Sequence, residues 1–369
     1  MSDKHKQPIL DSLHLRGVLD ALKRKTVPKH KTSILYYMGG LALMFFTVQV
    51  LTGILLLFYY EPSAATANKS IQHIMYEVPF GSLIRSIHSW SANALVLFVF
   101  IHMFSVMLMK SYRFPHRVMW LTGFVLLLLV LGFGFTGYLL PWDETAYFAT
   151  KIGAEVPLEL PVIGTFIADI IKGANDVNGA TLTRMFAVHV GVLPVISVLL
   201  VVAHIGMIML FGSSSPPNAV IKGQEKYFPD FLLKELMIWL VGFGILIAIA
   251  VLYPWGVGKA FDLANPTEPP AGVHPEWYFM FLFQTLRLFP EWMVIVGFGV
   301  VAVFWAFIPW LDRRAHHNQK SPIFTWIGVA AIVYIVSLTT WAYISVGEEE
   351  AEGSKPAVEH QQPDSTHAK

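Results

Sequence analysis

Long apolar runs separated by polar segments dominate this chain of 369 residues. A helix needs about 20 mostly apolar residues to cross a membrane, and several runs are long enough. They cover residues 34–58, 85–109, 118–140, 183–211, 235–253, 291–311 and 323–345. Apolar and polar residues do not alternate within these runs, so a membrane-spanning β-barrel is not expected. The pattern predicts an all-α, polytopic membrane protein with about seven transmembrane helices.

Two connecting segments, at about 141–182 and 254–290, are long enough to carry structure or function of their own. The first contains the apolar, proline-containing run 156–171, which predicts an interfacial helix rather than another span. The second is rich in proline. Beyond the last span, residues 348–369 are polar and predict a disordered tail.

The composition agrees with lipid as the main solvent of the chain. Hydrophobic residues make up 55% of the sequence and charged residues 14%, whereas a soluble domain has about 25% charged residues. A soluble globular enzyme of this length is therefore excluded. The net charge of +1 gives no general attraction to nucleic acid. The polar, basic N-terminus is unlike a secretory signal peptide.

The positions of lysine and arginine predict the orientation of the helices. These residues are concentrated in the N-terminal segment and in the second, fourth and sixth connections, which lie on one side of a seven-helix protein. Positively charged loops stay in the cytoplasm, so the N-terminus is predicted to be cytoplasmic, in a bacterial-type inner membrane. The loops on the opposite side are more acidic. The C-terminus is predicted to lie on that non-cytoplasmic side, which is the electrically positive side of the membrane.

Histidine is the main candidate for metal binding because the chain contains no cysteine. Disulfides, thiolate metal sites, iron–sulfur clusters and haem attached through thioethers are therefore excluded within this chain. Ionisable side chains are costly inside lipid and are functional candidates there. The histidines within the apolar runs are His88 and His102 in the second run and His189 and His204 in the fourth.

The spacing of these histidines predicts two facing pairs. His88 and His102 are 14 residues apart, which is about 21 Å and close to four helical turns. His189 and His204 are 15 residues apart, so His204 lies about 60° round the helix from His189, still broadly on the same side. The second and fourth helices run in the same direction, so the two pairs share two levels. A lone membrane histidine is equally well a hydrogen-bonded core residue, but matched pairs suit six-coordinate haem iron that transfers electrons.

Glycines on the first and third runs repeat this spacing. Gly39 and Gly53 are 14 residues apart, as are Gly123 and Gly137. Glycine lets a flat macrocycle approach a helix backbone, although close helix packing also favours small residues. Two pairs at the histidine spacing favour two stacked haems.

Three further features suit this chemistry. Arg85 and Arg184 precede a histidine at the ends of their runs, where a guanidinium can pair with haem propionates or extend to the membrane surface. In Pro275-Glu276-Trp277-Tyr278, a buried carboxyl can bind a quinol hydroxyl and take its proton, and burial would raise its pKa. Taken alone, that run is better explained as part of an interfacial aromatic belt.

Together these residues resemble cytochrome b, the membrane subunit of the cytochrome bc complexes (quinol–cytochrome c oxidoreductases). The resemblance covers roughly residues 30–345. It is carried by Arg85-Ser86-Ile87-His88, Gly137-Tyr138-Leu139-Leu140-Pro141-Trp142, Thr181-Leu182-Thr183-Arg184, and Pro275-Glu276-Trp277-Tyr278, together with the histidine pairs.

The resemblance implies two bis-histidine haems b and a Q cycle. His88 and His189 would ligate a low-potential haem near the positive side, and His102 and His204 a higher-potential haem near the negative side. Quinol would be oxidised at a positive-side site with Glu276, Tyr278 and Tyr138 as catalytic residues, lined also by Pro141, Pro275 and Trp277. One electron would pass to a Rieske iron–sulfur protein and the other through both haems to a quinone-reduction site, with proton translocation. A c-type cytochrome and a second copy of the chain are further implied partners.

The same resemblance divides the chain into four regions. They are a basic N-terminal segment at 1–33, a four-helix dihaem domain at 34–213, a three-helix quinol-site domain at 214–347 and the tail at 348–369.

Some features resemble the plastid type joined to its separate subunit IV, namely the 15-residue histidine spacing and the seven helices. The plastid type attaches an additional haem through a cysteine where this chain has Tyr37, so no covalently attached haem is expected. Asp230, Lys234 and Glu235 are candidates for the negative-side quinone site, although a charged helix start at the membrane surface explains each of them better.

Two other functions stay open from the sequence. One is a dihaem, quinone-linked membrane anchor of another dehydrogenase. The Pro275–Tyr278 run and its long connection are the features that distinguish a cytochrome b from such an anchor. The other is a transporter whose histidines bind protons or a metal, which would lack the visible absorption of haem.

Overall fold

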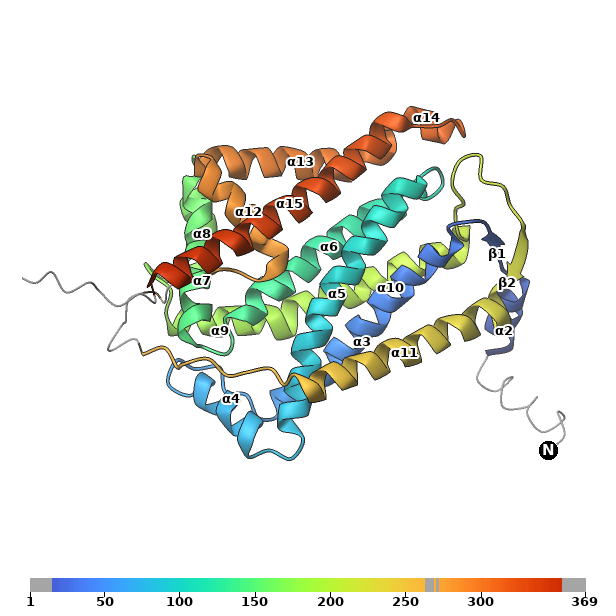
Figure 1. Ribbon diagram of the computed structural model, residues 1–369. Helices are drawn as coiled ribbons and strands as arrows, with labels where there is room; N and C mark the ends of the chain where they lie inside the picture. Colours follow the sequence, from blue (N-terminus) through green and yellow to red (C-terminus); the bar gives the residue numbers. More distant parts are fainter. Residues whose placement is uncertain (1–14, 263–268, 270–271, 354–369) are drawn as a thin grey trace, which may run out of the picture.

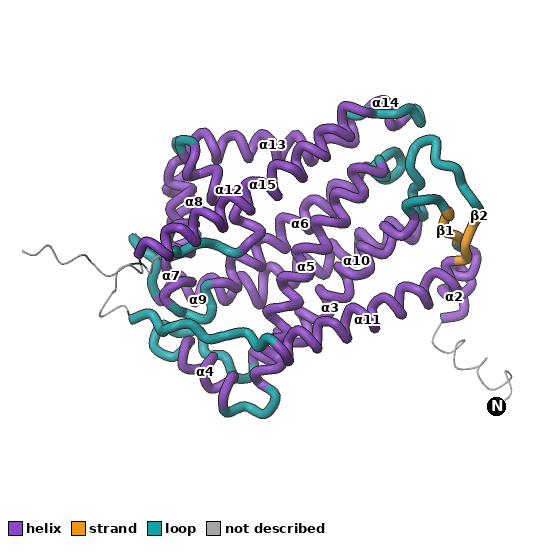
Figure 2. Tube along the Cα trace, in the orientation of Figure 1, coloured by secondary structure: helices purple, strands orange, loops and turns teal. Residues whose placement is uncertain are grey.

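The computed structural model describes residues 15–262, 269 and 272–353, and these residues are largely helical (Figures 1 and 2). Within them, 7 helical segments are long and apolar enough to cross a membrane. They are Ser33–Leu57, Gly81–Met109, Arg117–Tyr138, Gly179–Phe211, Tyr227–Leu252, Glu291–His316 and Pro322–Glu348. Each coincides with a predicted apolar run, so the all-α, polytopic prediction is confirmed.

The bounds of the described elements follow in chain order. They are α2 (Leu15–Arg24), β1 (Thr26–Lys29), η2 (Ser33–Tyr36), α3 (Tyr37–Leu57), α4 (Ala67–Tyr76), α5 (Gly81–Met109), α6 (Arg117–Tyr138), α7 (Glu144–Glu155), η3 (Val156–Glu159), α8 (Gly164–Lys172), α9 (Gly179–Ala187), η4 (Val188–Val192), α10 (Leu193–Phe211), β2 (Gly223–Lys226), η5 (Tyr227–Phe231), α11 (Leu232–Leu252), α12 (Trp277–Leu288), α13 (Glu291–Leu311), α14 (Arg313–His316) and α15 (Pro322–Gly353).

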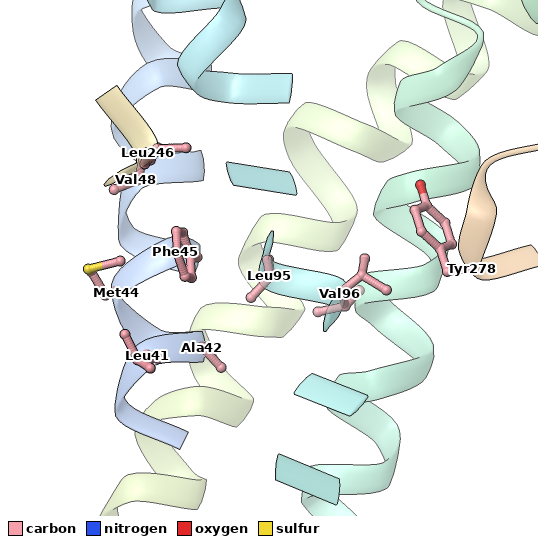
Figure 3. Packing of buried hydrophobic residues seen from close by; sticks show 10 residues of the cluster. Leu41, Ala42, Met44, Phe45, Val48, Leu95, Val96, Leu246 and Tyr278 are labelled. Atoms are coloured by element: carbon pink, nitrogen blue, oxygen red, sulfur yellow. The ribbon is translucent and has the colours of Figure 1, made fainter. Parts of the chain in front are cut away.

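The bundle is built around the packing of α3 along α5, with α11 on the same side and α6 packed against α10 (Figure 1). Phe45 and Val48 of α3, Leu95 of α5 and Leu246 of α11 belong to one buried apolar cluster (Figure 3). The outward faces are also apolar, and Leu240 of α11 is 73% exposed. Helices that are apolar on all sides fit a lipid environment.

The two ends of the bundle carry different elements. Helices α4, α7, α8 and α9 gather at one end, and α2, α14, β1 and β2 lie at the other (Figure 1). Strands β1 and β2 pair antiparallel, from Thr26 opposite Lys226 to Lys29 opposite Gly223. The sequence did not predict this pairing, which anchors part of the basic N-terminal segment to the connection before α11.

Two sequence-based boundaries need correction. The predicted interfacial helix at 156–171 is two short helices, η3 and α8, because Pro161 lies between them and a proline nitrogen donates no helical hydrogen bond. Helix α15 runs to Gly353, so the first residues of the predicted tail are helical. Glutamate and alanine in this stretch favour helix, and the rest of the tail lies outside the described residues.

Candidate functional site

The structure brings the membrane histidines together in the predicted pairs. His88 and His102 lie on α5, whereas His189 lies in η4 and His204 on α10. His88 lies close enough to His189 for a charge on one ring to act on the other, and the same holds for His102 and His204. Each level of the bundle therefore presents two imidazoles from two different helices.

A local change in helix type removes the predicted offset of about 60° between His189 and His204 around their helix. The segment Val188–Val192, which contains His189, is a π-helix. A π turn takes up one more residue than an α turn. The 15-residue spacing of His189 and His204 therefore spans nearly the same rise and rotation as the 14-residue spacing on α5. Pro194 follows the π turn, and its missing N–H removes one α-helical hydrogen bond there.

Each of the four predicted glycines faces one histidine ring. A methyl group at Gly39 would lie 2.9 Å from Cε1 of His102, and one at Gly137 would lie 2.7 Å from Cε1 of His189. The corresponding distances are 3.4 Å from Gly53 to His88 and 3.2 Å from Gly123 to His204. The glycines thus leave room for the imidazole rings, and the close approach of a macrocycle to these helices stays a prediction.

Three threonines hold histidine rings in place. Thr52 Oγ1 lies 2.9 Å from Nδ1 of His88, and Thr136 Oγ1 lies 3.0 Å from Nδ1 of His189. Thr122 Oγ1 lies 2.9 Å from Nδ1 of His204. The spacing pattern of histidines and glycines did not point to these threonines, although each directly precedes one of the spaced glycines, as a Thr-Gly pair.

The threonine hydroxyls fix the tautomer of these imidazoles. Each hydroxyl donates to a carbonyl of its own helix, such as Thr136 to Gly132 at 2.8 Å and Thr52 to Val48 at 2.6 Å. The oxygen lone pairs are then available to accept from Nδ1–H of the ring. This arrangement favours the tautomer with the proton on Nδ1, which leaves the lone pair of Nε2 for a metal.

The arrangement fits bis-imidazole ligation of haem iron. A neutral imidazole with an oriented Nδ1–H is the usual metal-binding form of histidine. The part of the chain that the structure describes contains no group of three or more histidine, aspartate and glutamate side chains that could hold a metal ion. Pairs of histidines are expected when a macrocycle supplies the other ligands.

Both candidate propionate-binding arginines contact backbone carbonyls. Arg85 is buried, and its Nη1 donates to the carbonyl oxygens of Trp255 and Gly256, at 3.0 and 2.7 Å. The Nη1 atom of Arg184 donates to the last turns of α8, at Asp169 and Ile170. These bonds tie the span ends to the connecting segments, and the predicted contact with propionates stays a prediction.

A largely apolar cavity of about 180 Å³ lies beside α6, between α7 and α12. Three of the residues predicted for the quinol site line it, namely Tyr138, Pro275 and Glu276, and His274 lines it as well. Burial raises the pKa of Glu276 above its ordinary value, and the charge of His274 partly opposes this. A carboxyl of this kind, beside an apolar cavity, can hydrogen-bond a hydroxyl and accept its proton.

The other predicted quinol-site residues do not line this cavity. Tyr278 is buried in the apolar cluster of α3 and α5, and its ring packs against Gly134. Trp277 Nε1 donates to Asn93 Oδ1 at 2.8 Å. The carbonyl of Pro141 accepts a hydrogen bond of 3.0 Å from Asn68.

The candidates for a negative-side site separate in the structure. Asp230 is exposed, and Lys234 pairs with Glu225 of β2. Only Glu235 of these three reaches into the bundle, where its carboxyl packs against Gly40. Tyr37 stacks on Phe231, with ring centroids 4.6 Å apart.

Comparisons with known proteins identify the family. The family model "Cytochrome b/b6/petB" matches residues 22–212, and "Cytochrome b(C-terminal)/b6/petD" matches residues 263–358. The chain is 48% identical over 338 residues to "Cytochrome bc complex cytochrome b subunit" of Chlorobaculum thiosulfatiphilum, covering 89% of this chain and 78% of that one. It is 42% identical over 206 residues to "Cytochrome b6" of Cyanidium caldarium, covering 56% of this chain and 95% of that one.

A structural comparison agrees with the family identified from the sequence. A chain of the solved structure "Hyperthermophilic respiratory Complex III" superposes with a TM-score of 0.74 and 25% identity, covering 94% of this chain and 99% of that one. Both parts of the sequence match a cytochrome b family model, and the four histidines lie within the first match, residues 22–212. The chain therefore belongs to the cytochrome b family and is of the type in which the b6-like part and the subunit-IV-like part are fused in one chain.

Proposed function

We propose that this chain is the quinol-oxidising dihaem subunit of a cytochrome bc complex, a quinol–cytochrome c oxidoreductase. Its partners are a Rieske iron–sulfur protein and a c-type cytochrome, and a second copy of the chain completes a homodimer. The observation that carries the proposal is the pairing of His88 with His189 and of His102 with His204 at two levels of the bundle.

The histidines would provide two ligands at each level. His88 and His189 would hold one haem b, and His102 and His204 would hold the other. The glycine opposite each ring leaves space for it. When bound, the two haems supply one-electron transfer across the membrane between two quinone sites. No covalently attached haem is proposed, because Tyr37 occupies the position of the attaching cysteine.

At the positive side, the cavity of Tyr138 and Glu276 binds the quinol head group. The apolar walls exclude water from the ring, and the Glu276 carboxylate takes a hydroxyl proton. One electron leaves to the Rieske protein and the other crosses the membrane to quinone at the negative side, so that a Q cycle translocates protons. Arg85 and Arg184 would pair with propionates of the positive-side haem, and Glu235 would contribute to the negative-side quinone site.

The chain divides functionally as its helices do. The four-helix region at 34–213 carries the haem ligands, and the region at 214–347 contributes Pro275 and Glu276 to the quinol cavity. We place the chain in a bacterial-type cytoplasmic membrane, with the N-terminus in the cytoplasm and the quinol cavity on the positive side. The two ends of the bundle support this orientation, because α7, which lines the cavity, lies at the opposite end from the paired strands β1 and β2 (Figure 1).

A redox titration of the purified complex tests the proposal, with haem and quinone measured on the same sample. We expect two haems b per chain, two separate midpoint potentials and quinol-dependent reduction of both. A correctly folded preparation without visible absorption would refute the proposal, and haem without quinol oxidation would favour an anchor of another dehydrogenase.

A further inference from the structure

The hydrogen bonds to the histidine Nδ1 atoms are unequal at the two levels. At the level of His88 and His189, both rings contact a threonine hydroxyl. At the other level, Thr122 serves His204, whereas Nδ1 of His102 is buried and has no hydrogen-bond partner among the described residues.

The cause of this difference is one residue in the sequence. Thr52, Thr122 and Thr136 each directly precede a glycine that faces a histidine. Gly39 faces His102 in the same way, but the residue before it is Met38, which has no hydroxyl. Position 38 is 14 residues before Thr52 on the same helix, so the two side chains lie on nearly the same face.

We propose that Thr52, Thr122 and Thr136 tune the reduction potentials of the two haems through their histidines, and that Met38 raises the potential of the haem held by His102 and His204. The proposal rests on the proposed function, since it requires bis-histidine haems at both levels. The threonines and Met38 are positioning residues in this view, because they act through the ligands rather than on the iron.

The physical reason is the basicity of the axial ligand. A hydrogen bond from Nδ1–H to an oxygen gives the ring more imidazolate character and makes Nε2 a stronger donor. A stronger donor stabilises the oxidised iron and lowers its reduction potential. Two such bonds at the His88–His189 level and one at the other place the lower potential beside the quinol cavity.

The inequality has a direction that suits electron transfer across the bundle. An electron that enters at the His88 level moves toward the higher potential at the His102 level, away from the cavity of Glu276. The absence of a hydroxyl group at position 38 therefore makes electron transfer from the His88 level to the His102 level more favourable, while both levels keep two histidine ligands.

Gain and loss of the hydroxyl test the proposal in the assembled complex, with midpoint potentials and ferric EPR spectra as readouts. We expect Met38→Thr to lower only the potential of the His102–His204 haem, changing its ratio of reduced to oxidised form up to about tenfold, or about 59 mV for one electron. Thr136→Val should raise only the potential of the other haem by a similar factor, and Thr136→Ser should restore it.

Thr47→Val is the matched control, because the Thr47 hydroxyl bonds to a carbonyl of the same helix but lies exposed. It should leave both potentials unchanged. Haem content is measured on every sample. Wild-type protein that lacks two haems would show that the proposed function itself is wrong. With both haems present, unchanged potentials in Met38→Thr and Thr136→Val, or equal shifts in Thr47→Val, would overturn the proposal.

Discussion

The contacts between glycines and histidine rings predict a graded effect of adding one methyl group. At Gly137, the new carbon would lie 2.7 Å from Cε1 and 3.2 Å from Nδ1 of His189. Carbon atoms pack at about 3.5–4.0 Å, so the ring or the helix must move by roughly 1 Å. Since the ring is a proposed iron ligand, the displacement falls on the geometry of ligation.

The size of the effect follows from two opposing contributions. Overpacking a filled site costs about 1–3 kcal/mol, and replacing a helical glycine by alanine contributes about 0.5–1 kcal/mol of stability. The net loss of folding stability is therefore roughly 0.5–2 kcal/mol. The overpacking itself falls on the ligand ring, and its cost corresponds to a loss of about 5- to 160-fold in haem affinity. Gly53→Ala should have little effect, because its methyl group would lie 3.4 Å from His88.

The assay is the ratio of each haem to protein after purification, read from reduced-minus-oxidised spectra and the two midpoint potentials. Gly206→Ala on α10 is the control, because a methyl group there would have no neighbour within 4 Å. We expect Gly137→Ala to lose or shift the His88–His189 haem and Gly206→Ala to match wild type. The reasoning fails if Gly137→Ala keeps both haems at unchanged potentials, or if Gly206→Ala is equally impaired.

Three further predictions concern other parts of the molecule. Burial raises the pKa of Glu276, so quinol oxidation that needs its carboxylate should rise with pH through this raised pKa; Glu276→Gln should slow the reaction, remove that rise and leave both haems bound. His102→Leu should remove only the negative-side haem, as measured by haem content and redox titration. Asp312 is buried and accepts hydrogen bonds from Tyr112 at 2.7 Å and Ser321 at 2.8 Å, so Asp312→Ala should destabilise the protein by about 2–4 kcal/mol in a thermal melt in detergent.

Each of these has a contrary outcome. Loss of haem in Glu276→Gln would assign Glu276 a structural role, and an unchanged pH profile would exclude it as the base. Full haem content in His102→Leu would contradict the ligand assignment. For Asp312, a melting temperature equal to wild type would mean that the bonds from Tyr112 and Ser321 contribute nothing measurable.

The sequence alone determined the membrane class, the seven spans and the two histidine pairs. Apolar runs of spanning length have few other solutions, because backbone polar groups in lipid must bond within a helix. Few ionisable side chains occur in those runs, so the functional candidates at His88, His102, His189 and His204 stand out without a structure.

Only the tertiary structure decided how these residues act on one another. The π turn at His189 and the one-to-one contact of each glycine with a histidine depend on the rotation and separation of neighbouring helices. The pairing of Thr136 with His189 joins residues 53 apart in the chain. Nδ1 of His102 has no partner among the described residues, and the methionine linked to this, Met38, is 64 residues away in the chain. Such contacts are non-local: periodicity within one helix fixes which face a side chain occupies, whereas packing between helices fixes what that side chain meets.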